Sequence, residues 1–123
     1  MPQPPDNLDD AFYDSVFEVQ IDERGFDPDN NVFGSPLHKT GAVYKVLPAR
    51  QWAAKAVVPR FSPRPGFWNR YEIRLQGQDV SVRLNDRLVS EGQLPAGSRT
   101  SGFIGLQCHT EVVQFRNIRI LEL

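Results

Sequence analysis

The sequence lacks most of the features that assign a protein class at once. Its 123 residues include one cysteine, Cys108, so no disulfide forms within the chain and packing must hold the fold together. No apolar run approaches the ~20 residues that span a bilayer. The N-terminus shows neither the basic nor the apolar segment of a signal peptide, and the compartment stays open. We therefore expect no membrane partner.

The sequence also has no large excess of positive or negative charge, because its fourteen Lys and Arg residues nearly balance its fifteen Asp and Glu residues. Non-specific binding of nucleic acid depends on cationic neutralisation of phosphates, so a net charge of −1 argues against nucleic acid as a partner. The balance is uneven along the chain. Residues 1–30 hold nine acidic side chains and one basic, whereas residues 31–123 hold thirteen basic and six acidic.

The motifs of the common cofactor and metal sites are absent as well. No P-loop, dinucleotide fingerprint, zinc cluster or Ser-His-Asp arrangement stands in the sequence. Asp27, Asp29 and Asn31 alternate as in a calcium loop, but Val32 replaces the glycine that the loop needs and His38 replaces its closing glutamate. We expect neither a metal nor a cofactor.

What is present predicts an all-β domain. The chain is 40% apolar with 13 aromatic residues, enough for a core, and its ten prolines and nine glycines argue against a helical bundle. Residues 1–11 are proline-rich and acidic, which is typical of an arm, and residues 12–123 form a single domain. Period-2 alternation predicts about seven strands and almost no helix, an antiparallel two-sheet sandwich.

Several strands are predicted from local patterns of apolar and polar residues. They include residues 16–22, 41–46, 102–109 and 112–123, the last with a bulge at residues 115–118 where the alternation changes face. A long loop is predicted over residues 23–40, and one helical turn over residues 51–58.

The clearest local pattern is a hairpin with a two-residue loop at Gly77-Gln78. This loop fixes the register, which places two apolar pairs on one face of the hairpin and an ion pair on the other. The predicted pairs are Leu75 with Val80, Ile73 with Val82, and Glu72 with Arg83.

A second tight turn is predicted at Asn85-Asp86, because both residue types tolerate the left-handed region. Leu84 and Leu88 share a face only if three residues form this loop.

Six short motifs stand in order along residues 17–120 and together resemble the 3-keto-disaccharide hydrolase family. They are Phe17-Glu-Val-Gln-Ile-Asp22, His38-Lys-Thr-Gly-Ala-Val-Tyr44, Trp68-Asn-Arg-Tyr-Glu-Ile-Arg74, Leu84-Asn85, Gly102-Phe-Ile-Gly-Leu-Gln-Cys-His109 and Phe115-Arg-Asn-Ile-Arg-Ile120. The resemblance implies a glycosyl hydrolase with a concanavalin A-like jelly roll. It covers the C-terminal part of that domain, so the family's N-terminal strands are expected to be lacking. Asp86 stands where the family usually has glycine, and Cys108 where a polar residue is more usual.

The resemblance implies acid/base chemistry on 3-keto-glycosides, by elimination and then hydration. We expect Glu18 and His109 to be the acid and the base, in either order. A further group is expected to orient the sugar: Gln20, Asp22, His38, Tyr44 and Gln107.

Taken alone, the same residues admit simpler interpretations. Glu18, Gln20 and Asp22 share one strand face, which is more typical of a solvated surface than of a sugar cleft. Both histidines are compatible with no role, and Tyr44 is as typical of a core as of a stacking platform.

Two further functions stay open on the sequence. One is a non-catalytic carbohydrate-binding module that uses the same concave sheet. The other is an incomplete domain, whose unpaired strand edges would allow a homo-oligomer.

Overall fold

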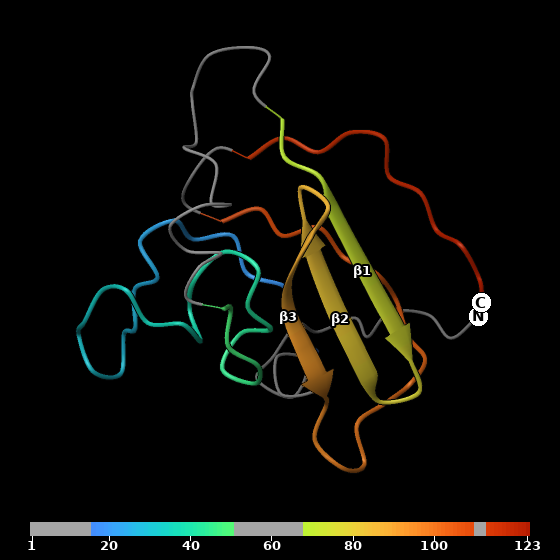
Figure 1. Cartoon of the computed structure of the whole chain (residues 1–123), viewed down its shortest axis with the longest axis horizontal. Helices are drawn as coiled ribbons and strands as arrows, with labels where there is room; N and C mark the ends of the chain where they lie inside the picture. Colours follow the sequence, from blue (N-terminus) through green and yellow to red (C-terminus); the bar gives the residue numbers. More distant parts are fainter. Residues whose placement is uncertain (1–15, 51–67, 110–112) are drawn as a thin grey trace.

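A computed structural model describes residues 16–50, 68–109 and 113–123 (Figure 1). Three strands form one antiparallel sheet in the order β1–β2–β3: β1 (Tyr71–Gln76), β2 (Asp79–Leu84) and β3 (Arg87–Gln93). The described residues contain no helix, which confirms the predicted all-β class. The predicted arm at residues 1–11 and the helical turn at 51–58 lie outside the described residues.

The hairpin of β1 and β2 has the predicted register. Leu75 pairs with Val80, Ile73 with Val82, and Glu72 with Arg83. Gly77 adopts a φ of +58°, a conformation that costs a glycine little, so the chain reverses within two residues. The predicted ion pair differs, because the Glu72 carboxylate lies 4.0 Å from Arg70 instead of bonding to Arg83.

The turn between β2 and β3 is a two-residue turn at Asn85-Asp86. Both residues have positive φ, +50° and +68°, which confirms the predicted left-handed turn. Leu84 therefore pairs with Arg87, and the three-residue loop that would align it with Leu88 is not formed.

A bulge in β3 compensates for this shorter turn. Arg83 pairs with Leu88 and Val82 with Ser90, so Val89 is an extra residue without a partner in β2. Val89 is fully buried, because a bulge lets two consecutive side chains approach the same side of the sheet.

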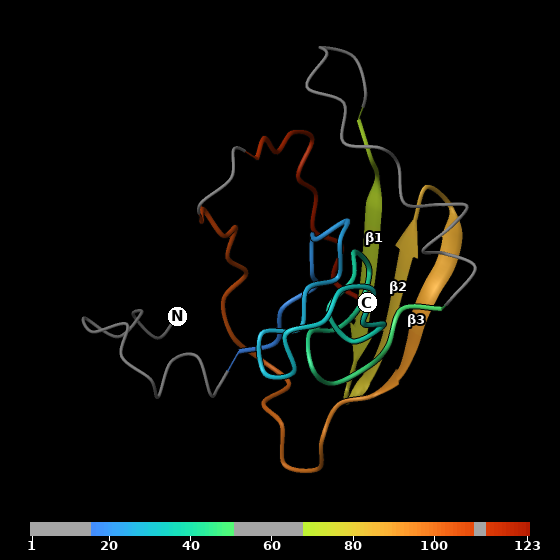
Figure 2. The same ribbon diagram turned by 90° about the vertical axis from the view of Figure 1, so that its left-hand side faces the viewer.

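The core lies between one face of this sheet and residues 16–49, which Figure 2 shows along one side of the sheet seen edge-on. Alternation along β2 directs Val80, Val82 and Leu84 inward. The buried cluster consists of Val43, Val80, Val82, Leu84, Val89 and Leu94, with Val19, Val46, Leu47 and Tyr71 packed against it.

Residues 16–22 and 40–44 are hydrogen-bonded to each other but form no regular strands, and residues 43–47 form a tight turn in which Lys45 has a φ of +58°. Their pairing is antiparallel and includes one isolated bridge, from Val19 to Val43. Val19 packs against the core as predicted, whereas Phe17 and Ile21 are exposed. The predicted strands are therefore reduced to a short irregular ladder.

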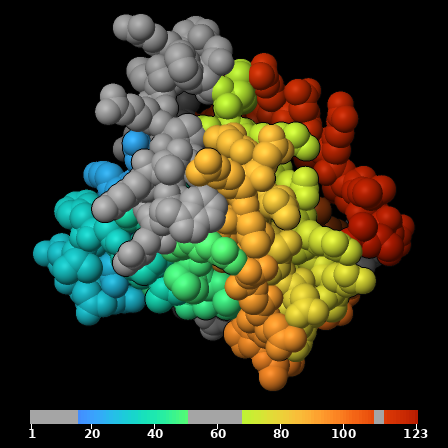
Figure 3. All heavy atoms as spheres, in the orientation of Figure 1, coloured from blue at the N-terminus to red at the C-terminus, as the bar shows by residue number. Residues whose placement is uncertain are grey.

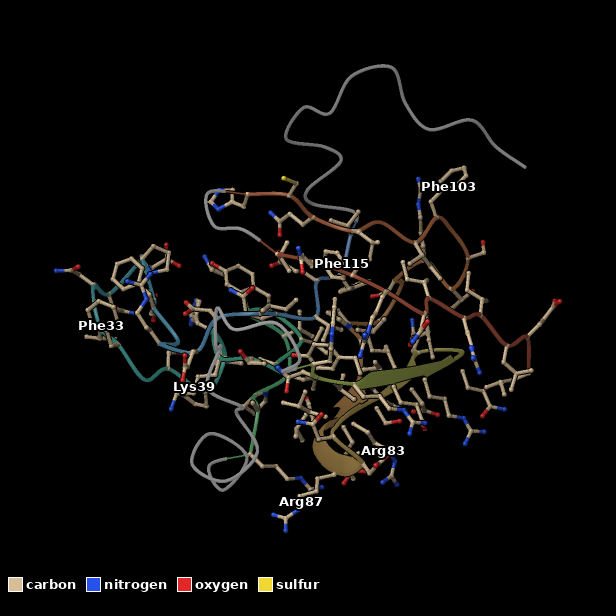
Figure 4. The ribbon with its side chains drawn as sticks, turned by 90° about the horizontal axis from the view of Figure 1, so that it is seen from above. Phe33, Lys39, Arg83, Arg87, Phe103 and Phe115 are labelled. Atoms are coloured by element: carbon tan, nitrogen blue, oxygen red, sulfur yellow. The ribbon has the colours of Figure 1, made fainter. Side chains whose placement is uncertain are left out.

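The predicted strands at residues 102–109 and 112–123 are absent from the described residues, 102–109 and 113–123. These segments are irregular and largely exposed, and Asn117, with a φ of +53°, turns the chain where a bulge was expected. A strand needs a hydrogen-bonded neighbour, and no described segment supplies one here. Phe103 and Phe115 lie on the opposite side of the sheet from Arg83 and Arg87 (Figure 4).

Candidate functional site

Four of the predicted site residues are brought together by the irregular ladder between residues 18–22 and 40–44: Glu18, Gln20, Asp22 and Tyr44. The Gln20 amide donates to the Ala42 carbonyl at 2.9 Å, and the Tyr44 amide donates to the Glu18 carbonyl at 2.8 Å. The Thr40 amide closes the ladder at the Asp22 carbonyl, at 3.0 Å. This pairing places Tyr44 beside Glu18, although their motifs are separated by a long loop.

The two predicted acid/base residues, Glu18 and His109, are linked by an electrostatic interaction. Partial burial raises the pKa of the Glu18 carboxyl above its ordinary value, and the positive charge of His109 partly opposes this rise. Glu18 is half-buried and His109 is exposed. A carboxyl whose pKa is raised is better matched to proton transfer near neutral pH than an ordinary glutamate.

Gln20 and Asp22 follow Glu18 along the same segment, and both are half-buried. The Gln20 side-chain oxygen accepts the Ile21 amide at 3.1 Å. The Asp22 carboxylate accepts the Arg24 amide at 2.8 Å and the Phe26 amide at 3.0 Å. Both oxygens of Asp22 therefore stabilise the turn that starts the long loop.

His38 lies behind Tyr44 and is 3% exposed. Its Nδ1 is hydrogen-bonded to the Ser35 hydroxyl at 2.7 Å, and its ring meets the Tyr44 ring edge-on with centroids 4.9 Å apart. Its Nε2 lies 3.8 Å from the Asp27 carboxylate and has no hydrogen-bond partner among the described residues. The buried His38 ring thus packs against the Tyr44 ring and restricts its orientation, while Tyr44 itself is half-buried.

Asp27 uses its carboxylate within its own loop. It accepts the backbone amides of Asp29 and Asn30 and the Asn30 side-chain amide, and these bonds lower the pKa of Asp27. Within residues 16–50, 68–109 and 113–123, no three His, Cys, Asp or Glu side chains gather as metal ligands would.

Gln107 lies on the same segment as His109 and is exposed, as is the Cys108 thiol between them. The ladder does not include this segment. Gln107 is therefore related to Glu18 through His109, which lies two residues further along the chain and interacts electrostatically with Glu18.

Tyr71 is a residue that the sequence did not assign to the site. Its hydroxyl donates to the Gln20 carbonyl at 2.9 Å, and burial raises its pKa. This bond ties the ladder to β1. Tyr71 stands within the sequence motif from Trp68 to Arg74, and this position could have identified it as a residue that supports the site.

A shallow groove lies on the outer face of the sheet, the face that is turned toward the viewer in Figure 3. None of the predicted site residues lines it. Its lining consists of Arg74, Gln76, Asp79, Val80, Ser81, Glu91, Gly92 and Gln93.

Comparison with known proteins agrees with the family suggested by the motifs. The family model of the 3-keto-alpha-glucoside-1,2-lyase-like domain matches residues 5–121, nearly the whole chain. No curated protein matches, and no solved structure matches. No helix in the described part of the chain has the length and apolar character to cross a membrane.

Proposed function

This chain belongs to the 3-keto-alpha-glucoside-1,2-lyase-like family, and we propose that it is an enzyme that cleaves glycosides carrying a ketone at C3 of the sugar. The family supports a carbohydrate-related activity. The interaction between the Glu18 carboxyl and His109 is the observation that carries the proposed chemistry.

The ketone makes the neighbouring C2–H bond acidic. A base removes this proton, and the electron pair moves to form an enediolate at C2 and C3. The enediolate then re-forms the ketone and expels the glycosidic oxygen from C1, while an acid protonates that oxygen. A C1–C2 double bond remains, and addition of water across it completes the hydrolysis.

Glu18 and His109 carry the two proton transfers in this proposal, one as base and one as acid. The raised pKa of Glu18 suits either role, because it brings the carboxyl closer to neutral pH. Gln20, Asp22, Tyr44 and Gln107 orient the sugar. His38, buried against the Tyr44 ring, acts as a positioning residue.

The proposed fold is a concanavalin A-like jelly roll in which β1–β3 belong to one of two sheets. Residues 1–11 are an arm, and residues 12–123 are the domain. The exposed inner side of β1 supports a further layer, because Ile73 and Leu75 point to the core face yet are half open to solvent.

Turnover of a 3-keto-glucoside tests the catalytic pair, with the unoxidised glucoside as the control substrate. Glu18→Gln and His109→Ala are each expected to lower kcat by about 10²–10⁴-fold. The exposed neighbour Glu23 is the matched control, and Glu23→Gln should leave turnover unchanged. Full activity in both site variants would remove Glu18 and His109 from the mechanism.

Hydrogen exchange at C2 in heavy water assigns the two roles. The variant that lacks the base loses exchange at C2, whereas the variant that lacks the acid keeps exchange but loses cleavage. The pH profile adds a second assignment. If Glu18 is the base, activity rises with pH through its raised pKa, and if it is the acid, activity falls there.

Binding of unmodified oligosaccharides without turnover of the 3-keto-glucoside would contradict this function. That result would favour a carbohydrate-binding module on the same surface.

A further inference from the structure

β1 is an edge strand with an open outer side. The sheet order places β2 on one side of it, and no described residue outside the sheet forms a backbone hydrogen bond to Tyr71–Gln76. Residues 113–123 run along this side (Figure 1) without forming such bonds. Two apolar side chains of β1 are also uncovered, Ile73 at 51% and Leu75 at 45% exposure.

The hairpin geometry decides which backbone groups this edge presents. In a two-residue hairpin the closing pair, here Gln76 and Asp79, exchanges both of its hydrogen bonds. Backbone groups alternate in direction along a strand, so those of Tyr71, Ile73 and Leu75 point away from β2. An added strand would pair with these three residues.

We propose that the chain forms a two-fold symmetric dimer in which β1 pairs antiparallel with β1 of a second copy, centred on Ile73. In this register Ile73 faces Ile73 of the second copy, and Tyr71 faces Leu75 twice. Each of these pairs exchanges two backbone hydrogen bonds. On the other face, Glu72 lies opposite Arg74 of the second copy, and the symmetry produces this opposite-charge pair twice.

The charges of β1 disfavour the neighbouring registers. A pairing centred on Arg74 would set this arginine opposite itself, and one centred on Glu72 would set two carboxylates opposite each other. Like charges directly opposite on adjacent strands are destabilising. A shift by one residue would place apolar and polar side chains on the same face.

The occupant of the edge is therefore a second copy of this chain. The result is one continuous sheet in the order β3–β2–β1–β1–β2–β3. Pairing also sets Ile73 against Ile73 and Leu75 against Tyr71 of the other copy, so the dimer forms the missing backbone hydrogen bonds of the open edge and covers part of its apolar surface.

Sedimentation of the full chain over a range of concentrations tests the proposal. The wild-type mass should change from monomer to dimer as concentration rises. Arg74→Glu changes two attractive pairs into repulsive ones and should raise the dimer dissociation constant about tenfold. Because Arg74 faces the neutral Ser81 within its own hairpin, this substitution spares the fold. Arg24→Glu makes the same charge change in the long loop and should have no effect.

Mixing two variants makes the test specific for the register. Glu72→Arg alone should also dissociate, because it sets Arg opposite Arg74 of the second copy. It sets Arg opposite Arg83 within its own hairpin as well, so urea unfolding must show that this variant is folded at the concentrations used. A mixture of the Glu72→Arg and Arg74→Glu proteins should form a heterodimer, because both cross-strand pairs are again of opposite charge. A wild-type chain that stays monomeric at every concentration overturns the proposal, as does a mixture that fails to associate or an Arg74→Glu dimer as tight as wild type.

Discussion

Replacing Asp86 by glycine should leave the stability nearly unchanged, whereas replacing it by alanine should lower it, because the Asn85-Asp86 turn holds a non-glycine residue in the left-handed region. Asp86 has a φ of +68°, and such a conformation costs an L-residue roughly 1–2 kcal/mol, at the lower end for Asp. Glycine relieves this cost. It also adds freedom to the unfolded chain, which is worth roughly 0.5–1 kcal/mol in the opposite direction.

The side chain of Asp86 must be counted as well. Its carboxylate accepts a hydrogen bond from Arg70 at 3.2 Å, but both side chains are largely exposed. An exposed ion pair contributes about 0–1 kcal/mol. The three contributions nearly cancel, so the unfolding free energy of Asp86→Gly should lie within about 0.5 kcal/mol of wild type, or within roughly 2 °C in Tm for a chain of this size.

Urea unfolding measures this difference, and Asp86→Ala supplies the control. Both variants lose the carboxylate, so their difference isolates the backbone contribution. Alanine keeps the strain of roughly 1–2 kcal/mol, while glycine relieves it but adds roughly 0.5–1 kcal/mol of unfolded-chain entropy, so alanine should be about 0.5–1 kcal/mol less stable than glycine at this position. If Asp86→Gly is no more stable than Asp86→Ala, the left-handed turn is not a source of strain and this reasoning is wrong.

Three further predictions concern the core, the ladder and the long loop. Leu84→Ala should lower the unfolding free energy by about 3 kcal/mol, whereas Leu75→Ala, at a half-exposed site on the same sheet face, should cost less than half of that in urea unfolding. Gly41→Ala should cost on the order of 2 kcal/mol, because φ is +92° and the added Cβ would lie 2.7 Å from Val89 Cγ2. The lowered pKa of Asp27 means that its carboxylate stabilises the fold above the ordinary value of 3.8, and that this stability is lost as pH falls through the native pKa. Urea midpoints measured from neutral to acidic pH should show this loss, and Asp27→Asn should lack it.

The sequence predicted the hairpin of β1 and β2 residue by residue, because its register depends on one short turn and on neighbouring residues. A two-residue loop at Gly77-Gln78 leaves one register that keeps Ile73 and Leu75 on a common face. The bulge at Val89 was missed. It arises from the conflict between a two-residue turn and the spacing of apolar residues in β3, which becomes visible when both strands are placed together.

The predicted strands at the C-terminal end failed for a different physical reason. Alternation over residues 102–109 specifies which side chains share a face, but it does not specify a hydrogen-bonded neighbour. In the candidate site, the motifs identified Glu18 and His109, which interact. They did not show that His38 would be buried behind Tyr44, because burial depends on how the loop folds back.

The arrangement of contacts along the chain has a consequence for how the protein folds and fluctuates. The meander of β1, β2 and β3 pairs residues that are close in sequence, so little chain entropy is lost before its contacts form, and we expect it to form early. Glu18 and His109 are separated by most of the chain, so their proposed pairing needs residues 16–22 and 102–109 to fold together. We expect this arrangement to form late and open often, so that backbone amides around Glu18 exchange with solvent faster than those of β2, and a bound sugar should slow that exchange.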